Sequence, residues 1–367
     1  MQRNATLYRR NEILGLYIHI PFCLSKCPYC DFYSIEYNQD TAKLYRDAVI
    51  RNIKALEETY DTVYFGGGTP ILLWREIVDI LQFVNTAGKY EITVEANPCC
   101  TTEEALYKLK NAGASRVSFG VQSLNGSELS LLGRRHTAEQ AEKAVLLAKK
   151  CGFDNISADI MLGTPSQNIK SIKDTINKLC ALPLTHISAY VLKIEHNTPF
   201  ASQKLDLPDE DTVCEVYLEA SELLEKNGFS QYEISNFSKK GFECRHNLKY
   251  WRCEEYVGIG PASHSFYKGK RFFVERSCAD FIESQLQKTI IEDKSPRTFD
   301  EYAMLKLRLC EGLSFEDCAA FGIDKDIIQN RLKHIPEKLY ITEKDRVALT
   351  REGFLLSNSV IGAILGY

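Results

Sequence analysis

The chain has 367 residues, of which 44% are hydrophobic and 26% charged, and this composition is typical of a globular protein with one large domain and a smaller one. Its formal net charge of −4 argues against general polyanion binding, so we expect no nucleic acid partner. The 13 cysteines are odd in number and irregularly spaced, which favours reduced thiols over a disulfide framework. Together with the lack of a long apolar run or a signal-peptide pattern, this predicts an unprocessed cytoplasmic protein.

Apolar runs alternate with helical periodicity from residue 14 to about residue 192. The expected strands are Leu14–Ile20, Thr62–Phe65, Glu91–Glu95, Arg116–Gly120, Asn155–Ile160 and His186–Leu192. The expected helices lie near 41–57, 71–86, 102–112, 136–150 and 168–181. Strands that each precede a helix predict a parallel α/β sheet with right-handed crossovers. Six such units are too few for a closed eight-stranded barrel, and their periodicity is also compatible with a doubly wound sheet.

Three cysteines, Cys23, Cys27 and Cys30, follow the first expected strand in the pattern CxxxCxxC. They therefore lie where a strand's carboxyl end is expected, which is where α/β folds build active sites. A disulfide would leave one thiol over, and a structural zinc site would need a fourth ligand. An iron–sulfur cube held by three thiolates would leave one iron open to an external ligand. We favour the iron–sulfur cluster and keep zinc as the alternative.

Polar residues recur where the later strands are expected to end. Three glycines and Thr69 follow the second strand, where they allow a ligand to approach the backbone or simply form a tight turn. Glu95 ends the third strand, and its carboxylate suits ribose hydroxyls or an ammonium group, although a solvated strand end is the ordinary alternative. Gln122 and Asp159 end the next two strands. Together these side chains are expected to face one mouth of the fold.

The regular pattern stops after residue 199. A helix is expected near 210–227, and residues 229–270 read as short, turn-rich segments. Helices near 299–311, 314–321 and 324–335 are followed by two short strands around a charged turn and a last helix, which suggests a winged-helix-like packing module. We therefore divide the chain into residues 1–200, 201–295 and 296–367.

The cysteine motif, with Tyr29 before its last cysteine, resembles that of the radical S-adenosylmethionine (SAM) superfamily, and YIHIPFC is similar to its coproporphyrinogen-oxidase-like branch. The resemblance implies a partial (β/α)6 barrel in which the three cysteines ligate a [4Fe-4S] cluster and SAM chelates the open iron. Arg134 follows Gln122 at the family's spacing for a SAM-contacting arginine, with Arg135 as the alternative. The SAM-binding residues implied by the resemblance are Tyr17, Gly67, Gly68, Thr69, Glu95, Gln122, Arg134 and Asp159.

The stretch HNLKYW combines His246, Tyr250 and Trp251 within six residues. From chemistry alone, a packed aromatic turn is the simpler interpretation, although a macrocycle does require aromatic faces and an axial histidine. HNxxYW, with YEISNF before it and GIGPASHS after it, resembles the HemW subgroup of heme chaperones. This resemblance implies heme binding at His246, Tyr250 and Trp251, with His264 or a cysteine as the alternative ligand. It also implies transfer of heme to a respiratory apo-hemoprotein, and it is compatible with a homodimer and docking on a membrane surface.

The competing interpretation is an oxygen-independent coproporphyrinogen III oxidase. That enzyme carries a further cysteine two positions after the third cluster cysteine, where this chain has Phe32, and a longer segment before the motif than the 22 residues found here. A radical SAM enzyme that modifies RNA or protein is a third class. We expect a chaperone and assign no catalytic residue.

Overall fold

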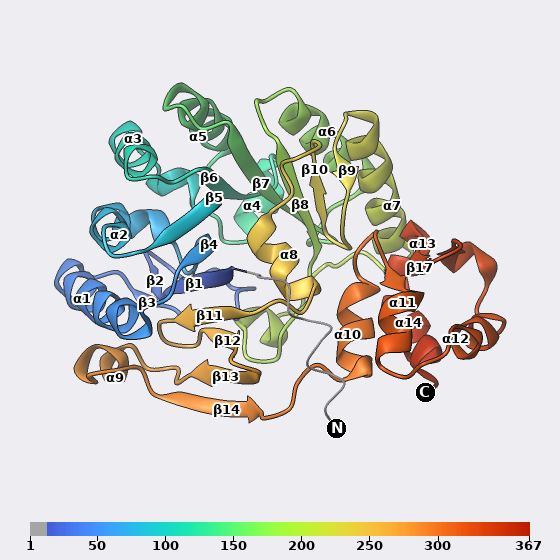
Figure 1. Ribbon diagram of the computed structural model, residues 1–367. Coiled ribbons are helices and arrows are strands. Elements are labelled where there is room, and N and C mark those ends of the chain that lie inside the picture. Colours follow the sequence, from blue (N-terminus) through green and yellow to red (C-terminus); the bar gives the residue numbers. More distant parts are fainter. Residues whose placement is uncertain (1–12) are drawn as a thin grey trace.

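In the computed structural model, residues 13–367 can be described. The expectation about an unprocessed N-terminus falls on residues 1–12, outside the described residues. The centre of the protein is a curved sheet of 12 strands in the order β14-β13-β12-β11-β1-β4-β5-β6-β7-β8-β10-β9 (Figure 1). Its parallel strands from the first half of the chain are β1 (Leu14–Ile20), β4 (Tyr60–Gly67), β5 (Thr86–Ala96), β6 (Arg116–Gln122), β7 (Asn155–Leu162) and β8 (His186–Val191).

Helices connect these strands, and most of them cover the outer face of the sheet, as Figure 1 shows. They are α1 (Gln39–Leu56), α2 (Trp74–Leu81), α3 (Glu103–Asn111), α4 (Gly126–Leu131), α5 (Ala138–Lys150), α6 (Ile169–Cys180) and α7 (Glu210–Lys226). The six predicted strands and the helices between them are confirmed. The helix expected near 71–86 is shorter than predicted, because β5 already begins at Thr86.

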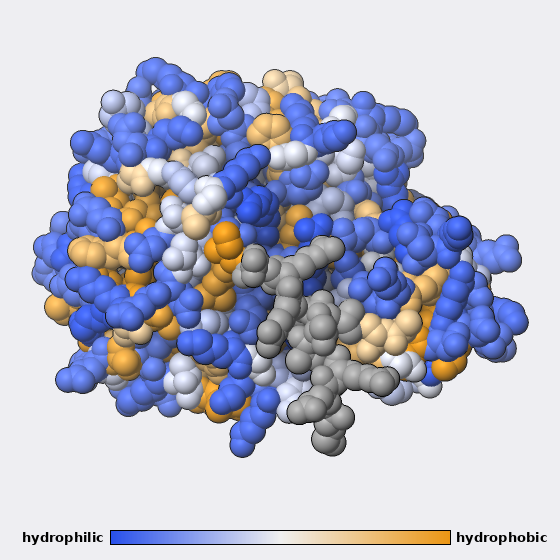
Figure 2. All heavy atoms as spheres, viewed as in Figure 1, coloured by the Kyte–Doolittle hydropathy of each residue, from blue (hydrophilic) through white to orange (hydrophobic). Residues whose placement is uncertain are grey.

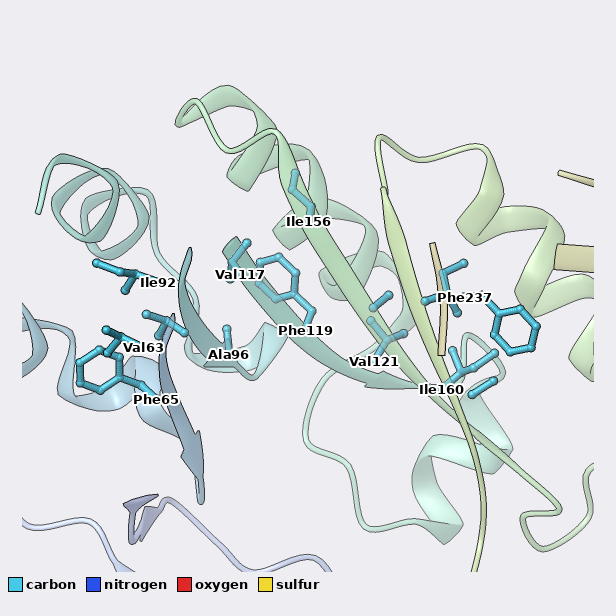
Figure 3. Close-up of a cluster of buried hydrophobic side chains, with 14 of the residues drawn as sticks. Val63, Phe65, Ile92, Ala96, Val117, Phe119, Val121, Ile156, Ile160 and Phe237 are labelled. Carbon is cyan, nitrogen blue, oxygen red and sulfur yellow. The ribbon is translucent and has the colours of Figure 1, made fainter. Parts of the chain in front are cut away.

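The alternation of side chains along each strand explains why the sheet has two different faces. Val63, Phe65, Val117 and Phe119 are buried in the apolar cluster between the sheet and its helices (Figure 3). The residues that alternate with them point to the inside of the curve and are largely polar. The inner face therefore collects Tyr17, Tyr64, Glu95, Ser118 and Asp159.

The segment 201–295 extends this sheet at both ends. On one side, β11 (Tyr256–Ile259) pairs with β1 in parallel and is followed by the antiparallel strands β12 (His264–Tyr267), β13 (Lys270–Val274) and β14 (Thr289–Asp293), with α9 (Cys278–Glu283) before the last. On the other side, β10 (Asn236–Ser238) and β9 (Ser230–Gln231) continue from β8. Helix α8 (Arg245–Trp251) lies inside the curve and contacts β4 (Figure 1). The boundaries at residues 200 and 295 stay a prediction.

The C-terminal part contains the predicted helices and paired strands. Its elements are α10 (Phe299–Lys306), β15 (Leu313–Ser314), α11 (Phe315–Ala320), α12 (Lys325–Leu332), β16 (Tyr340–Thr342), β17 (Arg346–Leu349), α13 (Arg351–Leu355) and α14 (Ser357–Leu365), with the three strands in one antiparallel sheet. The face of the molecule seen in Figure 2 is mostly hydrophilic with scattered apolar patches. None of the helices within residues 13–367 has the length and apolar character needed to cross a membrane.

Candidate functional site

The three predicted cluster cysteines lie on one loop beyond the carboxyl end of β1. The base of this loop is closed by pairing of β2 (Phe22–Cys23) with β3 (Ile35–Glu36) and by the Tyr37 amide, which donates to the Cys23 carbonyl at 2.9 Å. A turn in which the Cys30 amide donates to the Cys27 carbonyl at 3.1 Å brings the second and third cysteines together. All three side chains are partly exposed and form no disulfide.

Hydrogen-bond donors approach two of these thiols. The Thr69 hydroxyl lies 3.7 Å from Cys23 Sγ, and Arg134 Nη1 lies 3.5 Å from Cys27 Sγ. Hydrogen bonds to the sulfurs are one of the means by which a protein tunes an iron–sulfur cluster. Within the described part of the chain, no three His, Cys, Asp or Glu side chains lie close enough together to hold a metal ion, so the identity of the group on these thiols stays a prediction. The loop and its donors fit a larger, anionic cluster.

The glycine-rich turn after β4 packs directly against the cysteine loop. The amides of Gly68 and Thr69 donate to the carbonyls of Ile20 and Phe22, both at 2.8 Å. A Cβ on Gly68 would lie 2.6 Å from the Phe22 carbonyl oxygen, and Gly67 has a φ of 112° that disfavours any other residue. The glycines are therefore needed for the close approach of these two backbones.

Glu95 is fixed at the end of β5 by two donors. Its Oε1 accepts from the Tyr64 hydroxyl at 2.8 Å, and its Oε2 accepts from the Gly67 amide at 3.1 Å. Burial, with a contribution from the nearby Asp159 carboxylate, raises the pKa of Glu95 to about 7. A bound ammonium group would favour the ionised form of this carboxylate and would be favoured by it in turn.

The Arg134 guanidinium is held by hydrogen bonds, but one of its donors has no partner within the described residues. Its Nη2 donates to the Gly120 carbonyl at 2.5 Å, and its Nη1 lies 3.5 Å from the Tyr29 hydroxyl. Its Nε is buried and has no hydrogen-bond partner within residues 13–367. The adjacent Arg135 is exposed. An arginine with an unused donor beside Cys27 fits the carboxylate of an amino acid ligand, and it favours Arg134 over Arg135.

The remaining predicted SAM residues lie on the same inner face. The Asp159 carboxylate accepts from the Ser118 hydroxyl at 3.2 Å, and burial raises its pKa. Tyr17 hydrogen-bonds through its hydroxyl to His19 Nδ1 at 3.0 Å. Gln122 has a φ of 66°, the left-handed conformation that non-glycine residues adopt at a cost and often near functional sites.

Some of the predicted SAM residues line two different cavities. Tyr17 and Glu95 line a cavity of about 680 Å³ that runs from the inner face of the sheet toward β12–β14. Thr69 and Arg134 line a cleft of about 20 Å³ together with Cys27. Gln122 and Asp159 line neither cavity. The structure thus brings Cys27, Thr69 and Arg134 together in one cleft, and it places Tyr17 and Glu95 around the larger cavity.

The HNxxYW residues form part of helix α8. His246 is fully buried, and its two ring nitrogens are hydrogen-bonded to the hydroxyls of Thr62 at 2.9 Å and Tyr250 at 2.8 Å. Burial lowers the pKa of His246 to about 3. Tyr250 and Asn247 line the large cavity, whereas Trp251 lies near the Arg308 guanidinium at 6.0 Å. In this arrangement His246 positions Tyr250 and offers no free nitrogen lone pair to an iron, so its role as heme ligand stays a prediction.

Several residues of the site were not predicted as functional. Tyr64, the partner of Glu95, alternates with Val63 and Phe65 along β4, and this alternation already placed it on the polar face. Glu292 and Arg276, which line the large cavity, belong to the unpredicted β12–β14 extension. The sequence signal that could have predicted the β12–β13 hairpin is Lys268-Gly269. These two residues form its turn, and both have positive φ.

The fold and the site define a radical SAM protein. Residues 17–179 match the Radical SAM superfamily. The structure of coproporphyrinogen III oxidase HemN from Escherichia coli, described as a radical SAM enzyme, aligns with a TM-score of 0.80 over 97% of this chain and 90% of its own, at 20% sequence identity. This similarity shows a shared fold.

Similarity over the whole sequence identifies the family more narrowly. The chain is 34% identical over 380 residues to the heme chaperone HemW of Haemophilus influenzae, covering 96% of this chain and 98% of that protein. It is 32% identical to HemW of Lactococcus lactis, covering 95% and 96% of the two chains. The chain therefore belongs to the HemW family of heme chaperones.

Proposed function

We propose that this protein is a heme chaperone that binds heme and passes it to an apo-hemoprotein of the respiratory chain. The observation that carries the proposal is the similarity to HemW relatives along nearly the whole chain, at 34% and 32% identity. Docking on a membrane surface and formation of a homodimer are part of the same proposal.

The proposal includes a resident [4Fe-4S] cluster on Cys23, Cys27 and Cys30, with SAM on the open iron. Arg134 would pair with the carboxylate of SAM and Glu95 with its ammonium group, since each offers a complementary charge beside the cysteine loop. The glycine turn would let the protein backbone approach SAM closely. When bound, the cluster would supply one-electron chemistry, whereas the protein's own side chains would hold SAM and limit access of water. The other SAM contacts in this proposal are Tyr17, Gly67, Gly68, Thr69, Gln122 and Asp159.

One preparation tests the function. The protein is reconstituted anaerobically, titrated with hemin, mixed with an apo-hemoprotein, and assayed separately for turnover of coproporphyrinogen III with SAM and reductant. We expect stoichiometric heme binding, transfer of heme, and no porphyrinogen turnover. Turnover would instead identify a coproporphyrinogen oxidase, and a preparation that binds no heme would contradict the chaperone proposal.

A further inference from the structure

The large cavity has the size and lining of a site for a flat, mostly apolar ligand. Its volume of about 680 Å³ lies in the range of small-molecule sites. One end reaches Tyr17 and Glu95 on the inner face of the sheet, and the other opens beside β12 and β13. Aromatic side chains cover much of its wall, and among them are Phe32, Tyr33, Tyr250, Tyr256 and Phe273. Such faces suit the surface of a porphyrin.

Two histidines line this cavity, and they differ in what their rings can still bind. His19 is buried, with Nδ1 bonded to the Tyr17 hydroxyl and Nε2 donating to the Tyr33 carbonyl at 2.8 Å. The His264 side chain is 59% exposed, and its Nδ1 lies 3.1 Å from Glu292 Oε2. Its Nε2 has no hydrogen-bond partner within residues 13–367. His264 is therefore the cavity histidine with a nitrogen available to a metal.

The surroundings of His264 orient its ring as a metal ligand requires. A carboxylate that accepts the Nδ1 proton fixes the tautomer in which Nε2 carries the lone pair, an arrangement that recurs behind metal-bound histidines. The pairing of β13 with β14 shifts register at this point: Phe272 pairs with Ile291 and Arg271 with Asp293, which leaves Glu292 as an extra residue. Such a bulge redirects a side chain. The ring of Phe273 lies beside the imidazole, with centroids 5.6 Å apart.

Arg276, a positively charged side chain, also lines the large cavity. Arg276 Nη2 donates to the Asp31 carbonyl, at 3.2 Å, and the guanidinium lies 6.0 Å from the centre of the Tyr33 ring. This contact connects the end of β13 to the cysteine loop. Arginine has five donors, so most of them remain available for a carboxylate.

We infer that His264 is the axial ligand of heme in this protein, with Glu292 orienting its imidazole and Arg276 pairing with a propionate. The inference rests on the proposed heme-binding function and names the site at which that function is carried out. It places the iron at the outer end of the large cavity, away from the buried His246.

The test compares hemin with metal-free protoporphyrin IX, which has the same shape but cannot form an axial bond. The variants are His264→Ala and Glu292→Gln, and the matched control is His334→Ala, which removes another exposed histidine in the C-terminal part. We expect His264→Ala to weaken hemin binding by about tenfold or more, to change the Soret spectrum, and to regain binding when imidazole is added. Binding of protoporphyrin IX should change little, and His334→Ala should match the unmodified protein.

The outcomes separate the inference from the function on which it rests. An unmodified protein that binds no hemin would contradict the proposed function and the inference with it. If the unmodified protein binds hemin and His264→Ala binds it equally well, the ligand lies elsewhere and the inference is wrong. Equal loss of hemin and protoporphyrin IX in His264→Ala would also overturn it, because it would make His264 a packing contact.

Discussion

The guanidinium of Arg134 lies 3.5 Å from the thiol of Cys27, although 107 residues separate them in the sequence. A side chain from the loop between α4 and α5 thus reaches the cysteine loop after β1. Since the same guanidinium keeps a buried, unpartnered Nε, it can serve both the cluster loop and a ligand beside it. This relationship connects the proposed cluster to the proposed SAM site.

Replacing Arg134 by alanine should weaken SAM binding more than it weakens cluster binding. Hydrogen bonds to a charged group contribute about 1.5–3 kcal/mol, so we expect SAM affinity to fall by about 10- to 100-fold. Calorimetric titration of the reconstituted protein measures this, with iron content as the reference. Arg135→Ala is the matched control, because Arg135 is adjacent but exposed. Equal effects of the two substitutions would contradict the assignment.

Replacing any one of Cys23, Cys27 and Cys30 by alanine should abolish stable cluster binding, because each thiolate is expected to hold a separate iron. Iron and sulfide analysis after anaerobic reconstitution, together with the visible absorbance of the cluster, measures the effect. Cys151→Ala is a suitable control, since this half-buried thiol donates to the Glu103 carbonyl away from the loop. Full iron retention in one of the three variants would remove that residue from the ligand set.

Gly68→Ala should destabilise the protein and the cluster loop together. The added methyl group would meet the Phe22 carbonyl at 2.6 Å, and forcing the two backbones apart should lower the free energy of unfolding by about 1–3 kcal/mol. Gly126→Ala, at the start of α4, is the matched control because its Cβ would meet no atom within 4 Å. Denaturant unfolding of the apo proteins measures the difference. Unchanged stability of Gly68→Ala would show that the turn can relax.

The parallel half of the fold could be predicted from the sequence because each strand there combines a short apolar run with a following helical pattern. The strand Leu14–Ile20 has the predicted bounds. The cysteine loop, the glycine turn and Glu95 were predicted because strand ends in such folds meet at one edge.

The other wall of the large cavity could not be predicted in the same way. Its strands β12–β14 are antiparallel and partly exposed, and their pairing with β11 brings together residues that no local pattern connects. The contact between His264 and Glu292 depends on the bulge at Glu292. That bulge arises from the register in which β13 and β14 pair. The two hydrogen bonds that satisfy His246 likewise come from Thr62, which is 184 residues away, and from Tyr250 one helical turn on.

The stability of the apo protein should depend on pH through Glu95. Burial raises the pKa of Glu95 from 4.5 to about 7, so the folded state holds this proton more tightly than the unfolded state. The contribution of the protonated carboxyl is complete below about pH 4.5 and is lost as pH rises through about 7, by up to about 3 kcal/mol. Glu95→Gln cannot ionise, and it should therefore gain stability relative to the unmodified protein between these pH values and show a constant difference above them.

Denaturant unfolding of the apo proteins across this pH range measures the Glu95 effect. The exposed Glu104→Gln variant is the control and should run parallel to the unmodified protein. When SAM is added to the cluster-reconstituted proteins, it should favour the ionised carboxylate in the unmodified protein, because its ammonium group is the proposed partner of Glu95. SAM should therefore stabilise the unmodified protein more than Glu95→Gln at pH values above about 7. A pH-independent difference between the two proteins, with equal stabilisation by SAM, would contradict both the raised pKa and the proposed role of Glu95.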